Sequence, residues 1–260
     1  MSNFRKYGNS PHHIALIHGG PGAAGYLKPV AEVLSASNGI LEPFQTAGTI
    51  DGQVEELRKF LKENSDLPVT LIGHSWGAWL SVIFASENPE YVNKLILVSG
   101  GPFDDEYVKV INETRMSRLS EDEIIEMNKI KEQLNDPSVQ DKTGLLKKFG
   151  TLNSGTDYFC RVNSTDLVTE YRPDIFLTVN RESLYLRKSG KLLKSAGRLK
   201  CPVTAIHGDF DSHPSEGVQV PLSKVVSVFN FHLLEKCGHY PWNEKYAKDR
   251  FYEILVKELS

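Results

Sequence analysis

The chain has 260 residues, of which 40% are hydrophobic and 24% are charged, with a formal net charge of −3 at pH 7. This composition is that of an ordinary globular protein, and it excludes a disordered chain, a collagen-like repeat and a strongly basic nucleic-acid-binding protein. The length suits one large α/β domain, or such a domain with an insertion.

The cysteines and the N-terminal residues predict a soluble cytoplasmic protein. Cys160, Cys201 and Cys237 are far apart and include no Cys-x-x-Cys spacing, which fits reduced thiols better than a disulfide framework. Residues 1–8 contain no apolar stretch that resembles a signal peptide, and no later segment approaches the length of a membrane span. We therefore expect neither a membrane nor a nucleic-acid partner, while the oligomeric state stays open.

The first hundred residues alternate short apolar runs with helical patterns. Strands are predicted at residues 12–17, 40–41, 69–72 and 94–99, and helices at residues 27–34, 51–61 and 78–86. Strands that are separated by helices in this way predict a mostly parallel sheet with helices on both faces. The predicted fold class is therefore α/β.

In the middle of the chain the pattern changes to helices. Ser120 and Glu123 form a capping-box pattern in front of apolar residues at helical spacing. We predict a largely helical lid over residues 102–186, inserted into a core that residues 1–101 and 187–260 form. The alternative is a surface segment of ordinary helices that gates nothing.

The core pattern returns in the last sixty residues. Strands are predicted at residues 202–206 and 225–234, and apolar positions from Asn243 onward predict a closing amphipathic helix. Asp209, Asp211 and His213 follow the first of these strands, and His239 follows the second. Because the carboxyl ends of parallel strands meet at one edge of a sheet, we expect these side chains to lie close together.

The segment Gly73-His74-Ser75-Trp76-Gly77 lies between a predicted strand and a predicted helix. A strand that turns abruptly into a helix strains its turn residue, and the two glycines let the chain segments pass closely. Ser75 would then stand at a helix N-terminus, where negative charge is favoured. This context predicts a nucleophilic serine, and the alternative is a chance glycine–serine turn.

A nucleophilic serine needs a base and an acid that orients the base. His239 is the predicted base because it follows the last strand, and His213 is the rival because it is close to Asp211 in sequence. Asp211 is the predicted acid because it fits the spacing G-x-x-D after Gly208, and Asp209 is the alternative.

The segment His18-Gly19-Gly20-Pro21-Gly22 predicts an oxyanion loop, in which small residues let backbone N–H groups approach a developing alkoxide. The predicted donors are the N–H groups of Gly20 and Trp76. A nucleotide-binding loop is the alternative, but neither G-x-G-x-x-G nor G-x-x-x-x-G-K-[ST] occurs. The histidines show no H-x-x-x-H spacing, so no metal site is expected.

Together these motifs resemble the α/β-hydrolase superfamily of serine hydrolases, and most closely its prolyl iminopeptidase-like group. The resemblance rests on residues 18–22 and 75–77 and extends over residues 14–99 and 202–259. It implies an α/β-hydrolase fold and acyl-enzyme chemistry without a cofactor. The serine argues against the dehalogenase and epoxide hydrolase branches, in which the nucleophile is an aspartate.

Two features depart from the family pattern. Members usually carry an antiparallel hairpin before the His-Gly strand, whereas only residues 1–11 precede that strand here, so the first strands are expected to be missing or shorter. Proline-releasing members hold the free amino group of the substrate with lid acids. The lid of this chain offers Glu170 and Glu182 for that role, but no local motif matches either residue to it.

Three functions are therefore considered. The first is a hydrolase that cleaves a small ester, thioester or amide, with a small molecule or short peptide as substrate. The second is an aminopeptidase that releases an N-terminal residue such as proline. The third is a noncatalytic ligand-binding protein on a hydrolase scaffold, because fold alone does not secure function. A decayed scaffold should lose triad residues, and this chain keeps all three.

Overall fold

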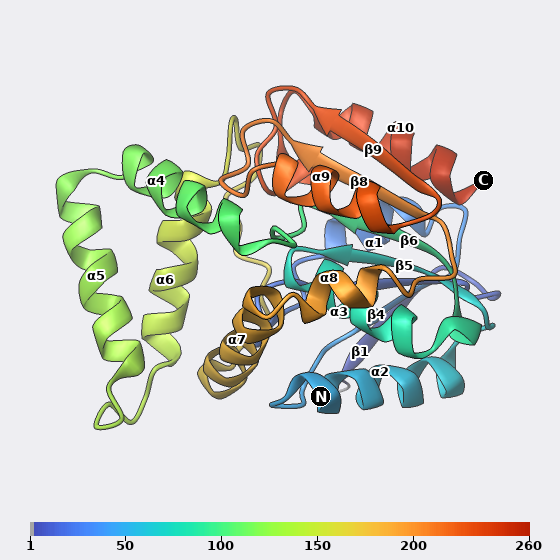
Figure 1. Cartoon of the computed structure of the whole chain (residues 1–260), viewed down its shortest axis with the longest axis horizontal. Coiled ribbons are helices and arrows are strands. Elements are labelled where there is room, and N and C mark those ends of the chain that lie inside the picture. Colours follow the sequence, from blue (N-terminus) through green and yellow to red (C-terminus); the bar gives the residue numbers. More distant parts are fainter. Residues whose placement is uncertain (1–2) are drawn as a thin grey trace.

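A seven-stranded sheet forms the centre of the computed structural model, which describes residues 3–260 (Figure 1). In spatial order the strands are β1 (Phe4–Tyr7), β4 (Ile40–Pro43), β2 (Ile14–Ile17), β5 (Val69–His74), β6 (Val92–Val98), β8 (Val203–Gly208) and β9 (Phe229–Leu234). All neighbouring strands run parallel except β1, which pairs antiparallel with β4. The predicted α/β-hydrolase fold class, a mostly parallel sheet between helices, is thereby confirmed.

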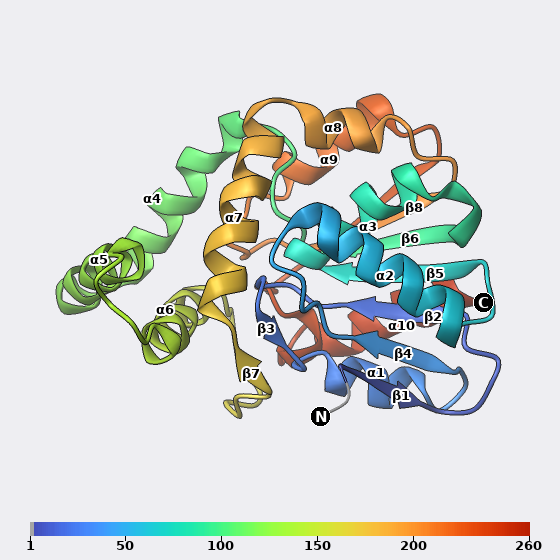
Figure 2. The ribbon, with the colours of Figure 1, turned by 90° about the horizontal axis from the view of Figure 1, so that it is seen from below.

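Helices cover both faces of this sheet (Figure 2). One face packs against α2 (Ile50–Asn64), α3 (Trp76–Glu87), α8 (Lys191–Ala196) and α9 (Glu216–Val225), and the other against α1 (Lys28–Leu34) and α10 (Lys248–Leu259). Because side chains alternate along a strand, Leu71 of β5 enters the first layer and Ile72 the second. Within residues 3–260, no helix is both long enough and apolar enough to cross a membrane.

Three core elements differ from the sequence-based expectation, namely α9, the last strand and β1. The helix α9 was not expected, because Pro221 lies inside it and interrupts the helical signal. The last strand begins at Phe229 rather than at residue 225. In the described residues, a single antiparallel strand, β1, stands where family members usually carry a hairpin.

The segment between β6 and β8 is largely helical, and it contains α4 (Val108–Arg118), α5 (Glu121–Asn135), α6 (Thr143–Thr156) and α7 (Pro173–Lys188). The capping box at Ser120 and Glu123 forms as the sequence predicts. α4, α5 and α6 project from the core in Figure 1, and α5 and α6 share a small apolar cluster of their own. In contrast, α7 packs into the main core through Ile175 and Val179 and ends two residues beyond the predicted lid boundary at 186.

A second, two-stranded sheet joins this helical segment to the loop that follows β2. β3 (Ala23–Ala24) pairs antiparallel with β7 (Glu170–Tyr171). The helical segment is thus anchored next to the glycine-rich loop at residues 18–22.

Candidate active site

Ser75 occupies the turn between β5 and α3 with φ 54° and ψ −118°, a backbone conformation that is strained for a residue other than glycine. Neighbouring glycines make the turn possible. A Cβ on Gly73 would overlap the carbonyl group of Gly77, and a Cβ on Gly77 would overlap the carbonyl oxygen of Ile17. The hydroxyl of Ser75 makes no hydrogen bond to any described residue, and Ser75 lines a cavity.

His239 and Asp211 meet at the same edge of the sheet, on the loops after β9 and β8. Nδ1 of His239 lies 2.7 Å from Oδ2 of Asp211, and both side chains are buried. Burial alone would lower the pKa of His239, but the charge of Asp211 and its hydrogen bond outweigh burial and raise that pKa. Burial would raise the pKa of Asp211, but His239 and His213 hold it well below its usual range.

His213, the rival base, contacts the same carboxylate as His239. Oδ1 of Asp211 accepts from the backbone N–H of His213 at 2.9 Å and lies 3.0 Å from its Nδ1. Nε2 of His207 donates to the carbonyl oxygen of His213 at 2.8 Å, which fixes this loop. Asp209, the rival acid, is exposed, and among residues 3–260 its carboxylate accepts only from the backbone N–H of Cys237.

His74 and Tyr26 link the glycine-rich loop to the loop of His239, a connection that no sequence motif indicated. The N–H of Gly19 donates to the hydroxyl of Tyr26, which lies 2.7 Å from Nδ1 of His74. Nε2 of His74 lies 2.8 Å from the carbonyl oxygen of His239. Burial holds the pKa of His74 well below its usual value, so the ring is neutral and both of its nitrogens are occupied.

The two predicted oxyanion donors border Ser75. Gly20 has φ +50° and lines the cavity, and its N–H has no hydrogen-bond partner in the described part of the chain. Trp76 is the first residue of α3, so its N–H has no carbonyl partner one turn earlier. A Cβ on Gly19 would clash with Cβ of Ser75, which shows how closely the loop approaches.

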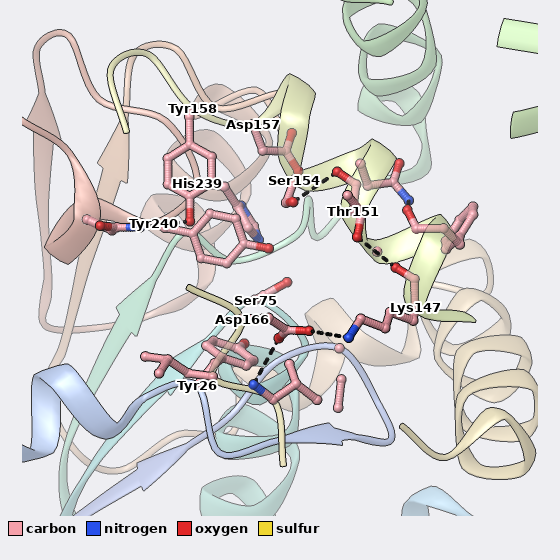
Figure 3. A pocket seen from close by; sticks show the side chains of 18 of the residues that line it. Tyr26, Ser75, Lys147, Thr151, Ser154, Asp157, Tyr158, Asp166, His239 and Tyr240 are labelled. Carbon is pink, nitrogen blue, oxygen red and sulfur yellow. Dashed lines mark hydrogen bonds and ion pairs between the residues drawn. The ribbon is translucent and has the colours of Figure 1, made fainter. Parts of the chain in front are cut away.

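A cavity of about 390 Å³ opens above Ser75, within the size range of small-molecule sites. Its core-side wall holds His239, His213 and Gly20, and its roof comes from the helical segment. The aromatic side chains in its wall include Tyr26, Tyr158, Tyr240 and Trp242. In Figure 3, His239, Tyr158 and Tyr240 lie together on one side of the cavity, and Lys147 lies on the opposite side.

Two ion pairs contribute charged groups to the cavity wall. Arg115 lies 3.0 Å from Oδ2 of Asp157, and Lys147 lies 3.4 Å from Oδ2 of Asp166. The side chain of Asp157 is 2% exposed, and its other oxygen, Oδ1, is buried without a partner in the described residues. A buried unpaired carboxylate oxygen favours a ligand that donates a hydrogen bond.

The predicted lid acids, Glu170 and Glu182, do not line this cavity. Glu182 instead accepts a hydrogen bond at 2.8 Å from the backbone N–H of Ile50, at the N-terminus of α2. Glu170 is exposed in β7 and has no hydrogen bond from its side chain to any described residue. Both carboxylates therefore lie outside the region where a substrate next to Ser75 would bind.

Glu244 joins the helical segment to the loop of His239, and no sequence motif marks it. Its fully buried carboxylate accepts from the backbone N–H groups of Phe159 and Cys160 at 2.7 Å and of Gly238 at 2.8 Å. In addition, the backbone N–H of His239 donates to the carbonyl oxygen of Asp157. The helical segment thereby helps to fix the position of His239.

Asp211, His213 and His239 also bring one potential metal-ligand atom each to within 4.8 Å of the others. The hydrogen bonds described above account for this closeness, since each imidazole Nδ1 faces an oxygen of Asp211. A metal ion at these atoms would have to replace both imidazole–carboxylate contacts.

Comparison with known proteins agrees with this architecture. A family model described as the alpha/beta hydrolase fold matches residues 1–240. VinJ is similar in structure (TM-score 0.70, 18% identity, 98% of this chain and 93% of VinJ covered). The meta-cleavage product hydrolase CumD from Pseudomonas fluorescens IP01 is also similar (TM-score 0.66, 15% identity, 98% of this chain and 92% of CumD covered). A structure from a study of Nitrososphaera gargenis carboxylesterases is similar as well (TM-score 0.66, 17% identity, 98% of this chain and 93% of that chain covered).

No curated protein matches the chain in sequence. At 15–18% identity, the structural similarity supports the fold alone. The family model matches residues 1–240, which is most of the chain, and it establishes the family. The chain belongs to the α/β-hydrolase fold family.

Proposed function

We propose that the protein is a serine hydrolase that cleaves a small ester, thioester or amide through an acyl-enzyme on Ser75. The observation that carries this proposal is the 2.7 Å contact between His239 Nδ1 and Asp211, on the wall of the cavity that Ser75 also lines. Family membership agrees with hydrolysis, and the similar structures include a meta-cleavage product hydrolase and one from a study of carboxylesterases.

His239 serves as the general base in this mechanism. Asp211 accepts the Nδ1 proton, which leaves the lone pair on Nε2 free to take the proton of Ser75 as the hydroxyl attacks the carbonyl carbon. Nε2 of His239 has no hydrogen bond within residues 3–260, and such contacts often tighten only when substrate binds. The imidazolium then returns the proton to the leaving group. In the second half of the reaction His239 takes a proton from water as the water oxygen attacks the acyl carbon, and it gives that proton to the oxygen of Ser75 as the ester bond to Ser75 breaks.

The negative charge on the carbonyl oxygen requires donors that are already in place. The unpaired N–H of Gly20 and the first N–H of α3, at Trp76, are the proposed pair. The macrodipole of α3 favours the same charge, because Ser75 immediately precedes this helix.

Turnover of p-nitrophenyl acetate by the wild type and by Ser75→Ala tests this proposal. We expect the variant to keep its circular dichroism spectrum and to lose about 10⁶-fold in kcat, as is typical when a triad nucleophile is removed. A folded Ser75→Ala protein that retained a tenth of the wild-type rate would contradict the mechanism.

An aminopeptidase is the second candidate, and the unpaired Oδ1 of Asp157 favours it. Asp157 lines the Ser75 cavity, but Oδ1 itself is enclosed by surrounding atoms, so a substrate ammonium group would have to displace part of that cover to donate to it. Arg115 occupies only the other oxygen of the carboxylate. Neither Glu170 nor Glu182 is placed for this contact.

Asp157→Asn separates the two candidates. An aminopeptidase should show a KM for a proline-amide substrate that rises about 10-fold or more, with a neutral ester spared. Glu170→Gln is the matched control, since that exposed carboxylate lies outside the cavity. If Asp157→Asn affects both substrates equally, the esterase alternative stands.

A further inference from the structure

Three imidazoles surround the carboxylate of Asp211, since Nε2 of His207 also lies 3.3 Å from Oδ2, and the proposed mechanism uses only His239. His239 faces Oδ2 and His213 faces Oδ1, and the two ring centroids are 4.7 Å apart with the planes tilted by 31°. The backbone N–H of His213 already satisfies Oδ1. The backbone of His213 is thus enough to position Asp211, and the ring of His213 is an additional group in the cavity wall.

The tautomer of His213 follows from its partner. An ionised carboxylate only accepts hydrogen bonds, so Nδ1 of His213 carries the proton that faces Oδ1. Burial lowers the pKa of His213, which keeps the ring neutral. In a neutral imidazole with Nδ1 protonated, Nε2 is a hydrogen-bond acceptor.

This acceptor is fixed in place and unused. Within residues 3–260, Nε2 of His213 has no hydrogen-bond partner, and it is not among the fully enclosed polar atoms. The side chain is 15% exposed and lines the same cavity as Ser75 and His239. Asp211 holds Nδ1 of the His213 ring, and His207 holds the backbone carbonyl of His213. The ring is therefore already ordered before a substrate binds, so binding does not have to immobilise it.

The position next to His239 indicates which part of a substrate would meet this acceptor. His239 delivers its proton to the leaving group, so the groups that extend past its ring toward His213 belong to the leaving-group side of the substrate. A site that is built to accept a hydrogen bond rejects an analogue without the donor, because its own polar atom then stays unpaired.

We propose that Nε2 of His213 accepts a hydrogen bond from the leaving-group side of the substrate and thereby selects leaving groups that carry a hydroxyl or amide N–H donor beside the scissile bond. This inference rests on the proposed serine hydrolase function. It makes His213 a specificity residue in addition to its contact with Asp211.

Two amide substitutions separate the two contacts of the ring. His213→Asn keeps an amide nitrogen near the position of Nδ1 and so keeps a donor to Asp211, but it has nothing at the position of Nε2. His213→Gln places an amide near the position of Nε2 and loses the group at Nδ1. The probes are 2-hydroxyphenyl acetate, which carries a donor on the leaving group, and 2-methoxyphenyl acetate, which carries none.

We expect the wild type to prefer the hydroxyphenyl ester by about 10-fold or more in kcat/KM. His213→Asn should lower kcat/KM for that ester about 10-fold more than it lowers kcat/KM for the methoxyphenyl ester. His213→Gln should keep the preference, because its amide oxygen can still accept, while both esters slow together. A wild type without the preference, or a His213→Asn variant that keeps it or slows both esters equally, would overturn the proposal.

Labelling of Ser75 by a fluorophosphonate distinguishes failure of this inference from failure of the proposed function. A wild-type protein that is folded but not labelled contradicts the serine hydrolase itself. If the wild type and both variants are labelled but the ester preference does not depend on Nε2, only the role of His213 is contradicted.

Discussion

Asp211 and Asp209 are two positions apart, yet their surroundings differ sharply. Asp211 is buried between His239 and His213, whereas Asp209 is exposed and accepts a hydrogen bond from the backbone N–H of Cys237. Asp211→Asn should lower kcat about 10⁴-fold, because an amide favours the wrong tautomer of His239. Asp209→Asn is the matched control and should change kcat little. Equal losses in ester hydrolysis, or the reverse order, would contradict the assignment of the acid.

The raised pKa of His239 gives a pH dependence. The base must be neutral to take the proton of Ser75, so kcat/KM should fall as the pH decreases through a midpoint above 6.5. Asp211→Asn removes the negative charge that opposes the lowering of the His239 pKa by burial. The pH midpoint of the residual activity should therefore decrease. A kcat/KM profile with its midpoint below 6.5 in the wild type would contradict the charge balance described for this site.

The sequence predicted which residues meet at the site better than it predicted what lines the cavity. Ser75, Asp211 and His239 could be chosen because each follows the end of a parallel strand, and the fold brings such ends together; their chemical roles stay predictions. Glu170 and Glu182 could not be placed from sequence, because partners such as the N–H of Ile50 come from distant segments. No motif marks Asp157 or Glu244 either.

At the scale of elements, the turn between β5 and α3 depends on close packing of α3 against β2. A Cβ on Gly77 would overlap the carbonyl oxygen of Ile17, and backbone atoms cannot yield without moving the strand. Gly77→Ala should therefore destabilise the protein by about 1–3 kcal/mol, or about 3–10 °C in Tm. Gly144→Ala is the control, because nothing lies within 4 Å of that position. Equal melting temperatures for the two variants would show that the packing is looser than described.

The junction between the helical segment and the loop of His239 depends on Glu244. Glu244→Gln turns one acceptor atom into a donor that faces backbone N–H groups, so it should lower Tm and reduce kcat about 10-fold or more. Glu253→Gln, which affects an exposed carboxylate paired only with Arg250, should leave both quantities unchanged. Calorimetry and ester kinetics check this prediction, and a Glu244→Gln protein with wild-type Tm and kcat would rule out the coupling.

Elements that the sequence predicted least well lie at the edges of the sheet. β1 was not predicted, because Phe4, Arg5, Lys6 and Tyr7 lack the continuous apolar run of a central strand. The start of the other edge strand, β9, was misplaced for a related reason, since all of its residues except Leu234 are exposed or only partly buried. Central strands such as β5 and β8 are buried almost throughout, so their apolar runs were recognisable.

At the scale of the whole molecule, the parallel sheet makes the site possible. Residues 75, 211 and 239 are far apart in the chain, and the carboxyl ends of β5, β8 and β9 bring their loops to one cavity. The helical segment closes that cavity from the other side, and its contacts with Glu244 and the β3–β7 pair hold it to the core. We expect the reactivity of Ser75 to depend on all of these parts together.

Intact-protein mass spectrometry after incubation with a fluorophosphonate tests that dependence most directly. We expect one adduct per chain, carried by the peptide that contains Ser75, because a serine is this reactive only when a base and an oxyanion site activate it. Ser75→Ala should not react, and His239→Ala should react far more slowly. A folded wild-type protein that forms no adduct, or that forms one on another residue, would contradict the central claim.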